Sequence, residues 1–276
     1  MRTGVRPPVL GGKWVCLLAA SLLLALSACE GQGAVPGPRP GRDAHKVKVS
    51  AAHAAALEAQ GAERIADYGS FRLLRVEPEV LAGAAPDAEI EIRDDFDEIL
   101  LNATTIDTAS DEGRALHGLR TGEPGPRLHL VQFQGPILPE WYRGLEESGV
   151  RIVAYIPNNA YLVYGDADVL AGASRLAAVQ WHGAFLNDFK IDPGVRSAAT
   201  EEWLIQLVKD EAANAATLER IRASAYEAPV VQEALGYVNV AVSMPRARVL
   251  EVALHPEVVS IQARPMPKPT ASGRRC

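Results

Sequence analysis

The stretch that decides the fold is Leu57–Val76, LEAQGAERIADYGSFRLLRV, followed by Val80–Ala84, VLAGA. Its pattern returns at Leu145–Tyr164, LEESGVRIVAYIPNNAYLVY, and Val169–Ala173 again has the letters VLAGA. A looser third copy runs from Trp203 to Ile261. Repeats of this length are whole supersecondary units. The sequence therefore predicts three versions of one small module.

The second copy shows the order of elements within a module. Alternation of apolar residues over 127–133 predicts a strand, and helical spacing over 139–148 with Gly149 behind it predicts a helix. The remaining predicted elements are strands at 151–156 and 160–164 around the turn Pro157-Asn158-Asn159, a helix at 166–176 capped by Asp166 or Asp168, and a strand at 178–182. The order β-α-β-β-α-β predicts an α+β fold of tandem ferredoxin-like modules.

Glycine- and proline-rich segments separate the copies, and they set the predicted domain boundaries. The divisions are a signal peptide at 1–28, a flexible tether at 29–44, module 1 at 45–108, a linker at 109–126, module 2 at 127–187, a linker at 188–200, module 3 at 201–264 and a disordered tail at 265–276. In module 1 we expect the last strand within Glu89–Asn102.

The first 29 residues predict a targeting signal. Arg2, Arg6 and Lys13 precede an apolar run, Val15–Leu26, which is too short for a comfortable membrane span of about 20 residues. The run ends in Leu26-Ser27-Ala28-Cys29, which resembles the lipobox of bacterial lipoproteins. That resemblance implies cleavage before Cys29, acylation of its thiol and anchoring to the lipid bilayer. Glu30, in place of Asp, favours the outer membrane over the inner membrane within the cell envelope.

Removal of residues 1–28 leaves 25 basic and 34 acidic residues, a net charge of −9. Binding to nucleic acid needs clustered Lys and Arg, so the charge excludes it as a partner. Cys276 is the one cysteine left besides Cys29, and a lone thiol forms no disulfide within the chain.

The third copy carries a resemblance to a known family. Tyr237–Val242 leads into Arg248–Ile261, with its turn His255-Pro256, and this resembles the closing half of a subtilisin propeptide or peptidase-inhibitor domain. Asp67–Phe71 and Tyr155–Ala160 extend the likeness, so that residues 45–265 resemble the N-terminal extension of secreted bacterial subtilases.

The resemblance implies that an open sheet packs on two helices of a subtilisin-like serine protease. It also implies that the tail lies in the active-site cleft like a substrate. That tail would comprise Gln262, Ala263, Arg264, Pro265 and Met266. A subtilase needs Asp, His and Ser in glycine-rich motifs, with Ser attacking and His acting as base. The nearest segments, His117-Gly118-Leu119 and His182-Gly183-Ala184, do not match, so we expect no catalytic residue and no enzyme activity.

Three functions follow from these observations. The first is a membrane-anchored protein that binds, inhibits or assists the folding of a subtilisin-like protease. The second is the prodomain part of a lipoprotein peptidase cut short before its catalytic domain. The third is a structural surface lipoprotein. An inhibition assay and the downstream DNA distinguish them.

Other candidate sites have simpler interpretations. Asp94, Asp95, Asp97 and Glu98 lack the glycine and spacing of a calcium loop, and a solvated strand edge explains them. The six histidines are scattered, with no metal-ligand spacing, so we expect neither metal nor cofactor. Core packing explains the recurring aromatic side chains of Trp141, Tyr142, Trp181 and Trp203.

Overall fold

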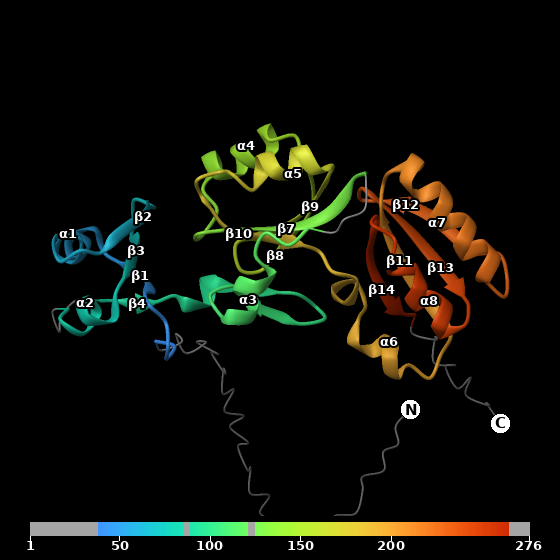
Figure 1. The fold of residues 1–276 in the computed structure, drawn as a ribbon, viewed down its shortest axis with the longest axis horizontal. Coiled ribbons are helices and arrows are strands. Elements are labelled where there is room, and N and C mark those ends of the chain that lie inside the picture. Colours follow the sequence, from blue (N-terminus) through green and yellow to red (C-terminus); the bar gives the residue numbers. More distant parts are fainter. Residues whose placement is uncertain (1–37, 85–88, 121–124, 265–276) are drawn as a thin grey trace, which may run out of the picture. The chain divides into compact units, whose positions relative to one another are not determined.

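The described part of the chain holds three four-stranded antiparallel sheets, a two-stranded sheet and the helices beside them, which confirms the predicted α+β class (Figure 1). A computed structural model describes residues 38–84, 89–120 and 125–264. The predicted signal peptide, Cys29, Pro265 and Met266 lie outside the described residues. In the three described ranges, no helix combines the length and apolar character that crossing a bilayer requires.

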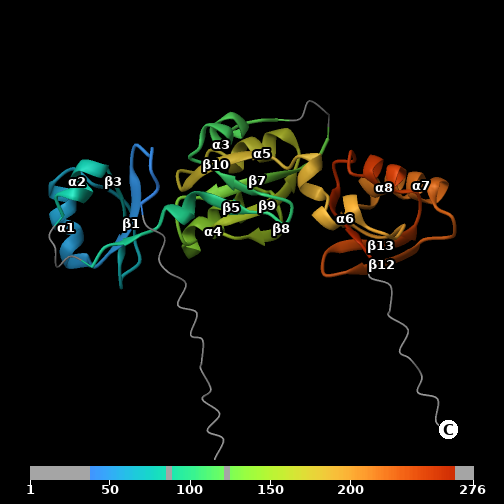
Figure 2. The ribbon, with the colours of Figure 1, turned by 90° about the horizontal axis from the view of Figure 1, so that it is seen from below.

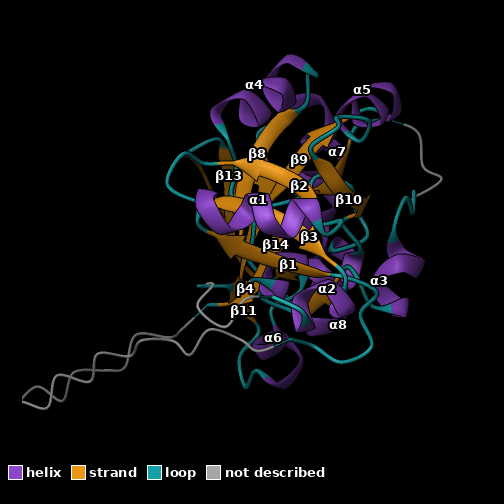
Figure 3. Ribbon diagram, turned by 90° about the vertical axis from the view of Figure 1, so that its left-hand side faces the viewer, coloured by secondary structure: helices purple, strands orange, loops and turns teal. Residues whose placement is uncertain are grey.

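The first sheet is formed by residues 45–92. Its elements are β1 (His45–Val49), α1 (Ala51–Ala59), β2 (Glu63–Asp67), β3 (Arg72–Val76), α2 (Pro78–Ala82) and β4 (Glu91–Ile92). Figure 3 shows α1 lying across the strands of this sheet. Ala54 and Leu57 of α1 pack on Val47, Leu74 and Val76, and form one apolar core.

The second sheet repeats this order of elements. They are β7 (Arg127–Phe133), α4 (Pro139–Glu147), β8 (Arg151–Ile156), β9 (Ala160–Gly165), α5 (Ala167–Ala173) and β10 (Val179–Ala184). The Asp166 carboxylate accepts a hydrogen bond from Val169 N and caps α5, while Gly149 follows α4 with a φ of 84°. Both ends agree with the sequence, because an N-cap carboxylate and a left-handed glycine are local signals.

The third sheet has the same order again. Its elements are β11 (Glu202–Val208), α7 (Glu211–Ser224), β12 (Val230–Ala234), β13 (Tyr237–Ser243), α8 (Arg246–Val252) and β14 (Val258–Ala263). Figure 2 shows α7 and α8 on one side of the sheet. Ile221, Val249 and Val252 from these helices pack on Trp203 and Val240 of the strands. Trp203 and Trp181 are buried, as predicted for core aromatic residues, whereas Trp141 and Tyr142 are only partly buried.

The strands of all three sheets are connected in the same way. The strand orders are β2-β3-β1-β4, β10-β7-β9-β8 and β12-β13-β11-β14. In each sheet the first strand lies between the third and the last, and each neighbouring pair is antiparallel. The repeated sequence is therefore a repeated topology.

Residues 94–117 form structure that the sequence did not predict. After β4 the chain continues as η1 (Asp94–Asp97), the hairpin β5 (Glu98–Leu100) and β6 (Thr105–Asp107), and α3 (Asp111–Leu116). Ile99 and Ile106 pack on Leu128, Leu130 and Leu162, which lie on the face of the second sheet opposite α4 and α5 (Figure 1). We name residues 94–117 the covering segment, because it buries that face.

The segment expected to be a linker at 188–200 also contains helices, η2 (Asn187–Lys190) and α6 (Pro193–Ser197). Ile191 forms a parallel bridge with Ile261 at the outer edge of β14. The Lys190 ammonium is buried and donates hydrogen bonds to Ala253 O and His255 O, both 2.8 Å away. This segment is part of the core of the third sheet.

Gly113 fixes the position of the covering segment. A Cβ atom at this residue would lie 2.7 Å from Thr108 Cα, closer than packed backbone allows. We expect Gly113→Ala to lower the free energy of unfolding by about 1–3 kcal/mol, as overpacking does. Gly172→Ala is the matched control, because nothing lies within 4 Å of its added methyl group in α5 and alanine favours a helix. Urea denaturation of both variants checks this, and equal stabilities would contradict it.

Candidate functional site

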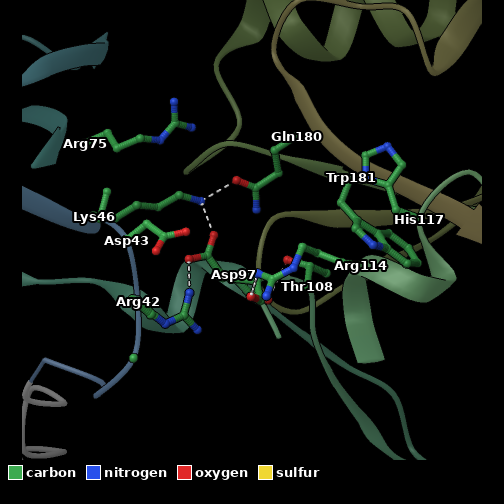
Figure 4. A pocket seen from close by; sticks show the side chains of 13 residues that line it. Arg42, Asp43, Lys46, Arg75, Asp97, Thr108, Arg114, His117, Gln180 and Trp181 are labelled. Atoms are coloured by element: carbon green, nitrogen blue, oxygen red, sulfur yellow. Dashed lines mark hydrogen bonds and ion pairs between the residues drawn. The ribbon is translucent and has the colours of Figure 1, made fainter. Parts of the chain in front are cut away.

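Polar and charged side chains line a cavity of about 380 Å³ (Figure 4). Its walls come from the chain before β1, from β1 and β3, from the covering segment and from β10. The lining residues are Gly41, Arg42, Asp43, Ala44, Lys46, Arg75, Asp97, Thr108, Ala109, Arg114, His117, Gln180 and Trp181.

Asp97 holds two buried cations at the floor of this cavity. Its Oδ1 is 2.7 Å from Lys46 Nζ, and its Oδ2 is 2.6 Å from Arg42 Nη1. The Lys46 side chain is 4% exposed, and burial lowers the pKa of its amine, against the attraction of Asp97. We name Arg42, Lys46 and Asp97 the clasp. It joins the first sheet to the covering segment.

A buried chain of hydrogen bonds extends the clasp to the second sheet. Lys46 Nζ donates to Gln180 Oε1, and Gln180 Nε2 donates to Gln132 Oε1 at 2.8 Å. Thr108 Oγ1 donates to the same Gln132 oxygen at 2.9 Å. Because each polar group has a partner, the network avoids the cost of burying unsatisfied groups. The network joins the first sheet, the covering segment and the second sheet by hydrogen bonds.

Asp94 corrects one sequence interpretation. The acidic cluster at 94–98 was expected to be a solvated strand edge, but Asp94 is 0% exposed and lies in η1. Its carboxylate is 2.8 Å from His45 Nδ1 and accepts from Lys46 N at 3.3 Å and Arg39 N at 3.1 Å. The end of the expected tether, residues 38–44, is likewise held: Arg42 is buried and also pairs with Asp107 at 2.9 Å.

Three of the six histidines come together, although the sequence suggested that they are scattered. His129 Nε2 lies 3.2 Å from His182 Nδ1, and the ring of His117 is 4.9 Å from that of His182. The pairing of β7 with β10 brings His129 and His182 together, and His117 lies next to His182 at the end of α3. Within 38–84, 89–120 and 125–264, no three His, Cys, Asp or Glu side chains are grouped so that they could hold a metal ion.

The surroundings of these histidines disfavour protonation. Burial, followed by the nearby His182, Arg120 and Arg127, lowers the pKa of His129 to about 3. Burial and the neighbouring His117 and Arg120 also lower the pKa of His182. His129 and His182 are therefore neutral in the folded protein at pH 7.

The third sheet has one face that the described chain leaves largely open. Side chains on this face form rows across the strands, Val230–Ala241–Leu204–Gln262 and Gln232–Asn239–Gln206–Ser260. We name these eight residues the open face, and none of them is charged. Val230 is 56% and Leu204 37% exposed, and Gln206 Nε2 donates to Asn239 Oδ1 at 3.1 Å. No local sequence pattern singles out these residues, because only the pairing of the four strands places them in adjacent rows.

The residues of the predicted cleft-binding tail begin inside the third sheet. Gln262 and Ala263 belong to β14 and pair with Leu204 and Trp203, and Arg264 N donates to Glu202 O at 2.9 Å. Any segment that leaves the sheet therefore starts at Arg264 or beyond it.

Removal of the clasp carboxylate leaves the buried Lys46 ammonium without its charged partner, and leaves Arg42 with Asp107 alone. We expect Asp97→Ala to lower the free energy of unfolding by about 3–5 kcal/mol. Glu219→Ala, which breaks the exposed pair with Arg222, is the control and costs about 1 kcal/mol or less. Chemical denaturation of the two variants measures the difference. A loss at Asp97 as small as that at Glu219 would show that the clasp is not buried in solution.

The histidine cluster predicts a loss of stability in acid. A histidine whose pKa is lowered by folding binds a proton more readily when unfolded, so its contribution is full above about pH 6.5 and falls as the pH drops towards 3. Each pKa unit corresponds to about 1.4 kcal/mol. We expect His129→Leu to flatten the dependence of the unfolding free energy on pH between 6.5 and 4, whereas His53→Gln leaves it steep. An unchanged slope in His129→Leu would assign the acid sensitivity to other groups.

Comparison with known proteins gives one family match. A family model described as a domain of unknown function (DUF8729) matches residues 100–186. The match starts at the end of β5, includes β6 and α3, and continues past β10. Its range thus joins most of the covering segment to the second sheet. No curated protein matches the chain.

Proposed function

We propose that this chain is a lipid-anchored protein of tandem ferredoxin-like modules that binds a subtilisin-like serine protease and inhibits it or assists its folding. The repeated strand order, with the first strand between the third and the last, supports the ferredoxin-like assignment. The lipobox-like Leu26–Cys29 supports the anchor. The likeness of residues 45–265 to subtilase propeptides supports the choice of partner.

The open face is the observation that carries this proposal. Propeptides of the family dock by a sheet face, and the three sheets of this chain differ in that face. The covering segment occupies it in the second sheet, and in the first it carries Lys46, Lys48 and Arg75. In the third sheet the eight residues of the open face are uncharged, and Leu204 and Val230 among them are exposed, while Glu202 lies in the next row at its margin. An uncharged face can pack on helices of a partner without burying unpaired charges.

The path of the chain agrees with this mode of binding. β14 is next to β11 and ends at Ala263, beside the open face. In the proposal the sheet docks first, and the segment from Arg264 onward enters the substrate cleft. Gln262 and Ala263 stay in the sheet, because their backbone groups are already paired with β11.

A charge placed on the open face tests the proposal. We expect the full chain at micromolar concentration to slow subtilisin in a peptide-cleavage assay. Leu204→Arg should weaken this inhibition at least about tenfold, because an unpaired guanidinium would be buried at the interface. Leu254→Arg introduces the same group at a position that is 66% exposed and away from the open face, and should inhibit like the parent.

The other outcomes discriminate between the alternatives. A parent chain that leaves subtilisin activity unchanged would contradict protease binding and favour a structural surface lipoprotein. Inhibition that is equally strong in both arginine variants would place the contact elsewhere on the chain. A catalytic Asp, His and Ser domain encoded directly downstream would favour a truncated peptidase.

A further inference from the structure

The third sheet ends at a strand whose outer edge is unpaired in the described ranges. β12 has β13 as its one neighbour in the sheet, and all five of its residues are exposed. Val230 is 56% and Val231 38% exposed, and Leu235 projects from the turn that follows. Unpaired N–H and C=O groups on such a strand are a template for another strand.

Both edges of the second sheet and the other edge of the third sheet contact other parts of the chain. At β10, Gly118 N donates to His182 O at 2.8 Å, and Ala184 N donates to Leu119 O at 3.0 Å. At β14, Asp192 N donates to Ile261 O at 2.9 Å. At β8, the Tyr237 hydroxyl donates to Val153 O at 2.7 Å. These contacts occupy backbone groups of each edge with other parts of the chain.

The edges of the first sheet are protected in other ways. β2 exposes charged residues, Glu63, Arg64 and Asp67, which discourage pairing, and β4 has only two residues. β12 has neither protection over Val230–Gln232. Its single charged residue, Glu233, is paired with Lys209 at 2.7 Å.

The turn after β12 shows which backbone groups point outward. Leu235 and Gly236 have φ angles of 53° and 82°, which is typical of a two-residue type I′ turn. Ala234 and Tyr237 are then the closing hydrogen-bonded pair, and the alternation of the antiparallel ladder continues from there. The N–H and C=O groups of Val231 and Glu233 therefore point away from β13.

We propose that β12 pairs with β12 of a second copy of this chain, antiparallel and centred on Gln232. In this register Val231 faces the partner's Glu233, and both residues present outward backbone groups, so four hydrogen bonds form. The side chains on the open face alternate as Val230 against the partner's Ala234 and Gln232 against the partner's Gln232. No like charges meet, and the two open faces become continuous.

The neighbouring registers are poorer. A shift in one direction sets Glu233 against the partner's Glu233, and like charges directly opposite are destabilising. A shift in the other direction sets Glu233 against the partner's Pro229, which has no N–H to donate. The sequence of β12 thus selects the register centred on Gln232.

A disulfide tests the register. Gln232 would face its copy in a non-hydrogen-bonded pair, where Cβ atoms are about 4.5–5.5 Å apart and can be bridged with a small adjustment. In the full chain with Cys16, Cys29 and Cys276 all changed to Ser, we expect Gln232→Cys to form a covalent dimer on oxidation. Gln262→Cys, exposed on β14 of the same face, and the cysteine-free parent should not. Equal cross-linking of all three, or none at Gln232→Cys, would overturn the pairing.

A proline tests the hydrogen bonds without disturbing the monomer. Val231→Pro removes an N–H that points outward, so the bonds to β13 are kept, and proline is tolerated on edge strands. We expect it to weaken dimerisation of the full chain at least about tenfold in sedimentation experiments, whereas Val231→Thr keeps the N–H and remains dimeric. A monomeric parent, or a Val231→Pro chain that dimerises like the parent, would overturn the proposal. Both results are independent of protease binding.

Discussion

A sheet has two faces, and each pair of helices in this protein covers only one of them. What covers or lines the other face accounts for most of the differences between the three repeated units. The covering segment buries it in the second sheet, with Ile99 and Ile106 against Leu128 and Leu130. In the first sheet the same face carries Lys46, whose ammonium is neutralised by Asp97 and donates a hydrogen bond to Gln180. In the third sheet the eight residues of the open face are uncharged, and the proposal assigns binding to this face.

The sequence predicts elements well where their signals are local. Asp166 caps α5 and Gly149 ends α4 because an N-cap carboxylate and a left-handed glycine act within one turn of the chain. The order of the covering segment was not predicted from local signals. The glycines and prolines at 122–126 predict a linker over 109–126, a range that includes the end of this segment. The order of the segment depends instead on distant partners, such as the hydrogen bond of 2.8 Å that Trp181 Nε1 donates to Gly113 O. No local pattern announces a contact between residues 68 positions apart.

The polar sites show the same limit more sharply. Asp94, Asp95, Asp97 and Glu98 look like a solvated acidic run, yet burial of Asp94 and Asp97 follows from partners on β1 and the chain before it. The three histidines are unremarkable in sequence, because only the pairing of β7 with β10 and the position of α3 bring them together. The sequence shows that charged and titratable residues stand at these positions. It does not show which groups compensate their charges, because those partners are brought together by the fold.

The open face and the edge of β12 are different directions of the same sheet, so their occupants need not compete. Side chains of Val230 and Gln232 project from the face, whereas the backbone of Val231 and Glu233 projects from the edge. A second copy paired at the edge would leave Leu204 and Gln206 free and would set two open faces next to each other. A protein bound to the face would in turn contact side chains without using the outward hydrogen-bonding groups of β12. Pairing at the edge would thus make binding at the face bivalent, and two linked weak contacts can hold a partner more firmly than either contact alone.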